Sequence, residues 1–124
     1  EAKENPNLEM AHVLVGEIYL LKEELNEADR SFRAAQRINQ KSIDALKGIA
    51  RIKVKKNEIP VAIELYNRAV TWKPDDASLH LILADLYRQM GQTQDAVRSY
   101  KNFLEIEPES PDKAKIEEFL KSVE

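Results

Sequence analysis

Small, aromatic and apolar residues recur along this chain at a fixed interval of 34 residues. The stretch Ala62 to Pro74, which reads AIELYNRAVTWKP, carries Ala62, Tyr66 and Ala69 at the spacing of one helix face. Equivalent residues stand 34 positions before and after them: Ala28, Phe32 and Ala35, and Ala96, Tyr100 and Phe103. A period of this length, built from two short amphipathic helices, is typical of an α-solenoid, in which each helix pair buries its apolar face against its neighbours. The pattern therefore predicts an all-α fold.

Two helices are expected in each 34-residue unit. The predicted helices span about 8–21, 26–38, 42–55, 76–90 and 94–106, and one more follows the turn at Asn57 and Glu58. Ser42 is expected to cap the helix at 42–55 and Asn26 the helix at 26–38, and Gly91 is expected to end the helix at 76–90. Gly48 lies inside a predicted helix, where glycine costs about 1 kcal/mol relative to alanine. It is either a neutral replacement or a notch that admits a ligand.

The last segment, residues 111–124, predicts a helix that closes the stack. Ser110 followed by Pro111 is a typical helix start. Apolar residues then follow at i, i+3, i+4 and i+7, namely Ile116, Phe119, Leu120 and Val123, while lysines and glutamates fill most other positions. One apolar face and one charged face suit a helix that covers the preceding hairpin.

This register resembles that of the tetratricopeptide repeat family, whose pattern places small residues at positions 8, 20 and 27, aromatic residues at 11 and 24, and proline at 32. The matching residues are Gly16, Tyr19, Ala28, Phe32 and Ala35 in repeat 9–42; Ala50, Ala62, Tyr66, Ala69 and Pro74 in repeat 43–76; and Ala84, Tyr87, Ala96, Tyr100 and Pro108 in repeat 77–110. Gln40, Lys53 and Phe103 depart from the pattern. The resemblance implies one domain over 1–124, an α-solenoid of three antiparallel helix hairpins wound as a right-handed superhelix and closed by the capping helix at 111–124.

Pro6 lies 34 residues before Gln40, in the place of the proline that ends a repeat. Residues 1–8 are therefore expected to be the tail of an upstream repeat, although a simple turn before the first helix is the alternative. The first helix carries Ala11, Leu14, Val15, Ile18 and Leu21 at helical spacing. If a repeat is missing, this helix exposes apolar surface that the preceding helix would have covered. We then expect weak self-association through the N-terminal end.

Composition removes several classes of function. The net charge of −3 argues against a nucleic-acid platform, which is usually basic. No cysteine is present, so disulfides, zinc–thiolate sites and thiol catalysis are excluded, while cytosol and periplasm both remain open as compartments. No apolar run approaches the roughly 20 residues of a membrane span. No phosphate-cradling glycine motif or catalytic triad is recognisable, so we expect neither an enzyme nor a cofactor.

The two histidines occupy the same place in their repeats. His12 and His80 are 68 residues apart, and this identical placement favours a structural role between helices over a metal or catalytic one.

In the family that this chain resembles, the first helix of each repeat lines a concave groove. The corresponding residues are Met10, Val13, Glu17 and Leu20; Asp44, Lys47, Arg51 and Lys55; and Ser78, Leu81, Asp85 and Arg88. Lys47, Arg51 and Lys55 recur every four residues and form a basic stripe on one helix face. The alternative is an ordinary solvated helix face. The family's carboxylate clamp for chaperone tails is not expected, because Val13 and Glu17 stand where it needs lysine and asparagine.

These features predict a non-enzymatic module that binds a protein or peptide in the groove. An acidic segment with apolar anchors suits the cations and the neighbouring apolar residues. An architectural segment of a longer solenoid, with no groove ligand, is the main alternative. A third is a regulatory part of an enzyme whose catalytic domain lies elsewhere.

Overall fold

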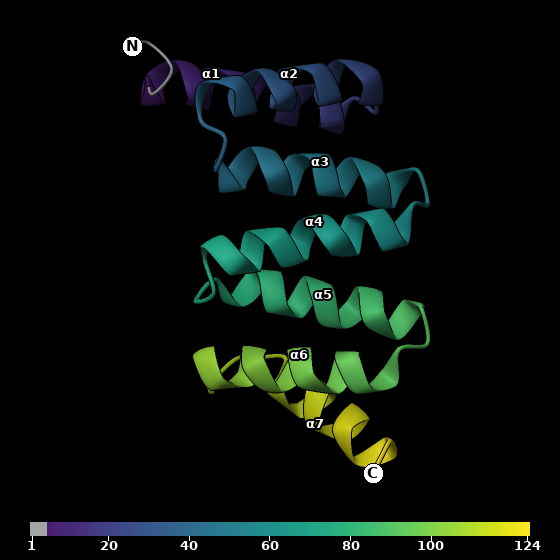
Figure 1. The fold of residues 1–124 in the computed structure, drawn as a ribbon. Coiled ribbons are helices and arrows are strands. Elements are labelled where there is room, and N and C mark those ends of the chain that lie inside the picture. Colours follow the sequence, from purple (N-terminus) through teal and green to yellow (C-terminus); the bar gives the residue numbers. More distant parts are fainter. Residues whose placement is uncertain (1–4) are drawn as a thin grey trace. The chain divides into compact units, whose positions relative to one another are not determined.

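The computed structural model describes residues 5–124, and in this range the chain forms seven α-helices and no strand. The helices are α1 (Pro6–Leu21), α2 (Leu25–Ile38), α3 (Ile43–Lys55), α4 (Ile59–Trp72), α5 (Ala77–Gln89), α6 (Thr93–Ile106) and α7 (Lys113–Ser122) (Figure 1). The predicted all-α helical repeat is confirmed. None of these helices is both long and apolar enough to cross a membrane.

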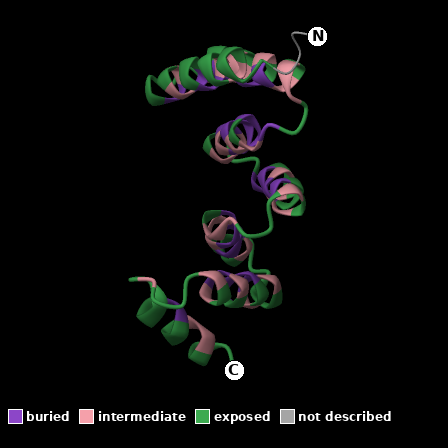
Figure 2. Ribbon diagram, turned by 90° about the vertical axis from the view of Figure 1, so that its left-hand side faces the viewer, coloured by how far each residue is buried: buried purple, intermediate pink, exposed green. Residues whose placement is uncertain are grey.

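The chain divides into two compact units, Glu1–Trp72 with α1 to α4 and Lys73–Glu124 with α5 to α7. In the first unit α1 pairs with α2, α3 pairs with α4, and α2 also packs against α3. In the second unit α5 pairs with α6, and α7 contacts α6. In both units the buried residues lie where helices meet, and the other helix faces are exposed (Figure 2).

Phe32 of α2 is at the centre of the first unit. Its side chain is fully buried in a cluster with Ala28, Ala35, Ile49 and Ile52, so α1, α2 and α3 share one core. The ring lies close to two glycines of the neighbouring helices. An ideal Cβ would be 2.8 Å from Phe32 Cζ at Gly16 and 2.4 Å from it at Gly48.

Gly48 therefore has a structural role that neither sequence interpretation included. Real Cβ atoms do not approach a ring carbon to within 3.0 Å. The glycine is a notch, as one interpretation held, but the group that fills it is Phe32 of the same chain.

The three turns within the helical hairpins share one backbone conformation. Glu23, Asn57 and Gly91 stand 34 residues apart and have φ angles of 62°, 61° and 75°. After each of them an amide donates to a carbonyl five residues back, as in the hydrogen bond from Gln92 N to Tyr87 O of 2.9 Å. The predicted left-handed end at Gly91 is thus present, and the same turn forms at two positions without glycine.

The helix starts agree only partly with the sequence predictions. Ser42 Oγ accepts a hydrogen bond from Ala45 N at 3.2 Å, as expected of a cap. Asn26 is not a cap, because α2 already begins at Leu25 and no side chain caps it. The last helix begins at Lys113 instead of 111, since Pro111 and Asp112 lie in a turn where Ser110 Oγ accepts from Asp112 N.

Pro6 differs from the prolines to which the sequence compares it. Pro74 and Pro108 lie in turns between helices, whereas Pro6 is the first residue of α1, and Asn5 caps that helix through Asn7 N and Leu8 N. The expected repeat tail at 1–8 therefore contributes its last three residues to α1, and residues 1–4 lie outside the described part.

In the second unit, Ala84, Ala96, Tyr100, Phe103 and Ile116 form the core. Ile116 is the one buried residue of α7, and Phe119 and Leu120 pack partly against the same cluster. Val123, which the sequence places on the inward face, is exposed. The closing helix is therefore held mainly by a short apolar segment.

Candidate functional site

The twelve predicted groove residues lie on α1, α3 and α5. Met10, Val13, Glu17 and Leu20 belong to α1, and Asp44, Lys47, Arg51 and Lys55 to α3. These two helices share the first unit, whereas Ser78, Leu81, Asp85 and Arg88 belong to α5 in the second. Each set follows the three- and four-residue spacing of one helix face.

Ion pairs join α1 and the turn that follows it to α3 on the predicted groove face. Arg51 Nη1 lies 3.0 Å from Glu17 Oε1 and 3.2 Å from Glu17 Oε2, and Lys55 Nζ lies 3.1 Å from Glu23 Oε2. The Arg51 and Glu17 side chains remain 42% and 38% exposed, so solvent and solutes reach this pair. Lys47 also has an interaction partner. The basic stripe is thus partly neutralised by the chain's own carboxylates.

Two of the four α1 residues cannot serve as surface anchors. Val13 and Leu20, expected to line the groove, are only 4% and 2% exposed and belong to the core with Phe32. They are buried because the side of α1 that meets α2 and α3 includes these positions. Met10 is exposed, so it is the apolar side chain that this part of α1 offers to a ligand.

In the second unit, Asp85 and Arg88 are tied to aromatic side chains. Tyr100 Oη donates to Asp85 Oδ1 at 2.7 Å, and Arg88 Nη1 lies 3.4 Å from Tyr100 Oη. The Arg88 guanidinium carbon also lies 4.3 Å from the centre of the Phe119 ring. Phe119 meets Tyr100 edge to face, with ring centres 5.3 Å apart. These contacts fix both charged groups beside α7.

A hollow forms where the predicted groove face of α5 meets α7. It is lined by Leu81, Asp85, Arg88 and Tyr100 together with Asp112, Lys115 and Ile116 of the C-terminal segment. Lys115 and Phe119 were not among the residues predicted for this face. The signal was present, because they follow Leu81 and Asp85 by 34 residues.

Burial raises the pKa of the Tyr100 hydroxyl above its usual value, and the hydrogen bond to Asp85 raises it further. Burial also raises the pKa of Tyr66, with the positive charge of Arg51 acting in the opposite direction. Both groups are therefore neutral at physiological pH, and neither is tuned for acid–base chemistry there.

The histidines sit in positions that packing explains. His80 is buried, and its Nε2 lies 2.8 Å from Pro74 O. His12 is half-buried on α1 beside Tyr19. Among residues 5–124 no three histidine, aspartate or glutamate side chains come together in a way that suits a metal ion.

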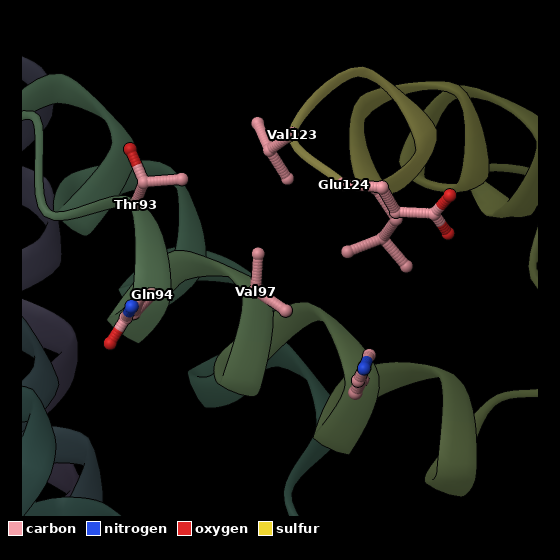
Figure 3. Close-up of a pocket in the computed structure, with 7 residues that line it drawn as sticks. Thr93, Gln94, Val97, Val123 and Glu124 are labelled. Carbon is pink, nitrogen blue, oxygen red and sulfur yellow. The ribbon is translucent and has the colours of Figure 1, made fainter.

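A second hollow in the same unit lies between α6 and α7. Thr93, Gln94 and Val97 of α6 face Val123 and Glu124 across it (Figure 3), and Lys101 and Leu120 complete its lining. The lining offers apolar contact and one carboxylate, but no nucleophile paired with a base.

Comparisons with known proteins identify the repeat. Two models described as tetratricopeptide repeat match residues 11–42 and 78–114, together more than half of the chain. No curated protein matches the sequence.

Several solved structures are similar to this one. The first repeat domain of Spaghetti (RPAP3), bound to the HSP90 peptide SRMEEVD, has a TM-score of 0.82 at 14% identity, with 94% of each chain covered. The type III secretion translocator chaperone SycD of Yersinia enterocolitica has a TM-score of 0.80 at 12% identity, covering 94% of this chain and 92% of that one. MamA has a TM-score of 0.73 at 22% identity, and this chain spans 60% of its length. At these identities the likeness is one of fold.

Proposed function

Because this chain belongs to the tetratricopeptide repeat family, we propose that it is a protein-interaction module that binds a partner segment on the groove face of α1 and α3. The observation that supports this proposal is the exposed, charged face of α1 and α3, where Arg51 meets Glu17 and Lys55 meets Glu23. No catalytic constellation competes with this interpretation in the described residues.

The ligand that suits this face is an acidic segment with an apolar anchor. A carboxylate of the ligand takes the place of Glu17 on Arg51, whose guanidinium offers the two-pronged geometry that carboxylates prefer. Because an exposed ion pair contributes only about 0–1 kcal/mol, exchanging Glu17 for a ligand carboxylate costs little. Met10 then receives the apolar side chain of the ligand.

One structural relative gives this ligand class a parallel. The HSP90 peptide bound by the Spaghetti domain, SRMEEVD, contains three acidic residues together with methionine and valine. The parallel is one of chemistry, since Val13 and Glu17 of this chain do not reproduce the chaperone-tail clamp. We therefore propose the acidic, apolar class and not the HSP90 tail itself.

The test uses three fluorescent peptide pools of equal length, one acidic and apolar, one basic and apolar, and one neutral and polar. Binding to the wild-type chain and to Lys47→Glu with Arg51→Glu is measured by anisotropy at two salt concentrations. We expect preference for the acidic pool, and at least a tenfold loss in the double variant, which is about 1.4 kcal/mol. Raising the salt should weaken wild-type binding, because the contacts are exposed.

Arg68→Glu provides the matched control. Arg68 lies on α4, is about as exposed as Arg51, and pairs with Glu64 within its own helix. This variant changes the net charge by the same kind of substitution away from the groove face. If it weakens binding as much as the double variant does, or if the pools bind equally, the groove-face proposal is wrong.

A further inference from the structure

Helix α1 exposes a continuous set of large apolar side chains. They are Leu8, Met10, Leu14, Val15, Ile18 and Leu21, with exposed fractions from 43% for Val15 to 83% for Leu21. The other side of the helix, with Val13, Gly16 and Leu20, is buried against the rest of the first unit. A contiguous apolar face of this kind in a soluble domain usually marks an interaction site.

The repeat register identifies what covers the same face elsewhere in the unit. Ala45, Ile49 and Ile52 of α3 stand 34 residues after Ala11, Val15 and Ile18 of α1. On α3 these residues are buried, in one cluster with Ala28, Phe32 and Ala35 of α2. The face that is open on α1 is therefore the face that a small–aromatic–small helix covers on α3.

The last helix does not continue the repeat in the same way. The residues 34 positions after Ala84 and Tyr87, which pack toward α6, are Glu118 and Lys121 of α7, and both are exposed. These exposed charges give α7 the polar outer face that is typical of a terminal helix. The apolar face of α1 has no such adaptation.

One position on α1 sets the size of the side chain that fits. Leu14 occupies the place that Gly48 has on α3, where the Phe32 ring is seated. A covering helix of α1 therefore needs a smaller apolar residue than phenylalanine at its centre.

A hollow beside this face supplies a polar edge. It is lined by His12, Val15 and Tyr19 of α1 and by Glu27, Arg30 and Arg37, among other residues, of α2, so its arginines outnumber its one carboxylate. Two arginines at the edge favour an acidic side chain at the flank of the covering helix.

We propose that Ala11, Leu14, Val15 and Ile18 on the outer face of α1 form a docking site for one amphipathic helix of the α2 kind, presented by a further helical hairpin that stacks on α1. This helix has small residues at the places of Ala28 and Ala35, an aliphatic residue at the place of Phe32, and an acidic residue at its flank. The site includes none of the predicted groove residues, since Met10 belongs to the groove face, so it adds a second interaction surface to the proposed function.

The probes are two peptides with the sequence of α2, residues 25–38, one native and one with Phe32→Leu. Each is held helical by a cross-link between positions 33 and 37, which are both exposed on α2, because isolated helices of this length are marginal in water. Binding is followed by amide chemical shifts of the full chain. We expect the leucine peptide to bind the wild-type chain and to shift the amides of Ala11, Val15 and Ile18.

The size of the central residue gives the decisive comparison. In Leu14→Gly the space for the central side chain resembles that at Gly48 on α3. The native peptide, which carries phenylalanine there, should therefore bind about tenfold more tightly, and the leucine peptide should bind more weakly. Ile18→Asp should abolish binding of both peptides. Leu21→Asp is the matched control. Its counterpart on α3 is Lys55, which is exposed and not covered by α2, so Leu21 lies outside the docking site although it is an exposed apolar residue of the same helix; binding should persist.

Three results would overturn the proposal. If Leu14→Gly weakens the binding of both peptides equally, the face binds apolar helices without selecting the size of the central residue. If Ile18→Asp leaves binding unchanged, the peptides bind elsewhere. If the chain alone forms a dimer that Ile18→Asp abolishes and the peptides displace, a second copy is the occupant and the stacked-hairpin proposal fails.

Discussion

The ring of Phe32 on α2 lies against Gly48 on α3, so closely that an ideal Cβ at Gly48 would be 2.4 Å from Phe32 Cζ. Phe32 also lies beside Gly16 of α1. The ring therefore contacts both its own hairpin, α1 and α2, and the first helix of the next hairpin, α3. The hydrogen side chain of Gly48 is thus a packing requirement that outweighs the helix propensity of alanine at this position.

Gly48→Ala should destabilise the chain. Alanine improves helix propensity by about 1 kcal/mol, but overpacking a rigid buried ring typically costs about 1–3 kcal/mol. We expect a net loss of about 1 kcal/mol in the free energy of unfolding, measured by urea denaturation. Adding Phe32→Leu should recover part of it, with a coupling of at least about 0.5 kcal/mol. A Gly48→Ala variant that is more stable than the wild type would contradict this packing.

The 34-residue register was enough to predict the helical repeat, because the residues that define it are the buried ones. Ala28, Ala62 and Ala96, for example, recur every 34 residues and all lie in the core. What the register could not give was the partner of each polar group. The Arg51 to Glu17 pair joins residues 34 positions apart, and its geometry depends on how α1 packs on α3. The same packing buries Val13 and Leu20, which single-helix periodicity could not assign to core or surface.

Glu23 adopts a left-handed conformation, with a φ of 62°, that its counterpart Gly91 adopts without a side chain. For a residue with a Cβ this conformation costs about 1 kcal/mol. Glu23→Gly should therefore raise the free energy of unfolding by about 0.5–1 kcal/mol, less the small contribution of its exposed pair with Lys55. Gly91→Ala is the reciprocal variant. Nothing lies within 4 Å of a Cβ there, so a loss of about 1 kcal/mol would measure the backbone term alone. Equal stability of all three chains would refute this account of the turn.

Tyr100 should make the chain sensitive to alkali. Burial and the Asp85 hydrogen bond raise its pKa in the folded state above the value of about 10 in the unfolded chain. Above pH 10 the unfolded state loses this proton first, so the folded chain binds more protons and stability falls as pH rises. The stabilisation is fully present below pH 10 and is lost as the pH rises through the folded-state value.

Tyr100→Phe separates the two contributions of the hydroxyl. At pH 7 it should lower stability by about 1 kcal/mol through the lost hydrogen bond to Asp85. Above pH 10 its stability should fall less steeply than that of the wild type, by up to about 1.4 kcal/mol per pH unit. Tyr66→Phe is the comparison variant, because it removes a second buried hydroxyl that lacks the Asp85 contact. Parallel pH profiles for wild type and Tyr100→Phe would rule out the proposed linkage.

Phe119 should control how firmly α7 is attached. Its ring meets both the Arg88 guanidinium and the Tyr100 ring, contacts worth about 0.5–1 and 0.5–1.5 kcal/mol respectively. Because Ile116 is the one fully buried residue of α7, these contacts are a large share of what holds the helix. Phe119→Ala should speed amide hydrogen exchange in residues 113–122 by about tenfold or more, while exchange in α5 and α6 stays slow. Phe119→Leu keeps apolar contact but loses both ring interactions, so its exchange rate in residues 113–122 should lie between those of the wild type and Phe119→Ala. Val123→Ala is the control, because it shortens an exposed side chain of the same segment, and it should leave the exchange rate unchanged. If Val123→Ala speeds exchange as much as Phe119→Ala does, general loss of apolar surface at the C-terminus governs the attachment of α7, and not the ring contacts with Arg88 and Tyr100.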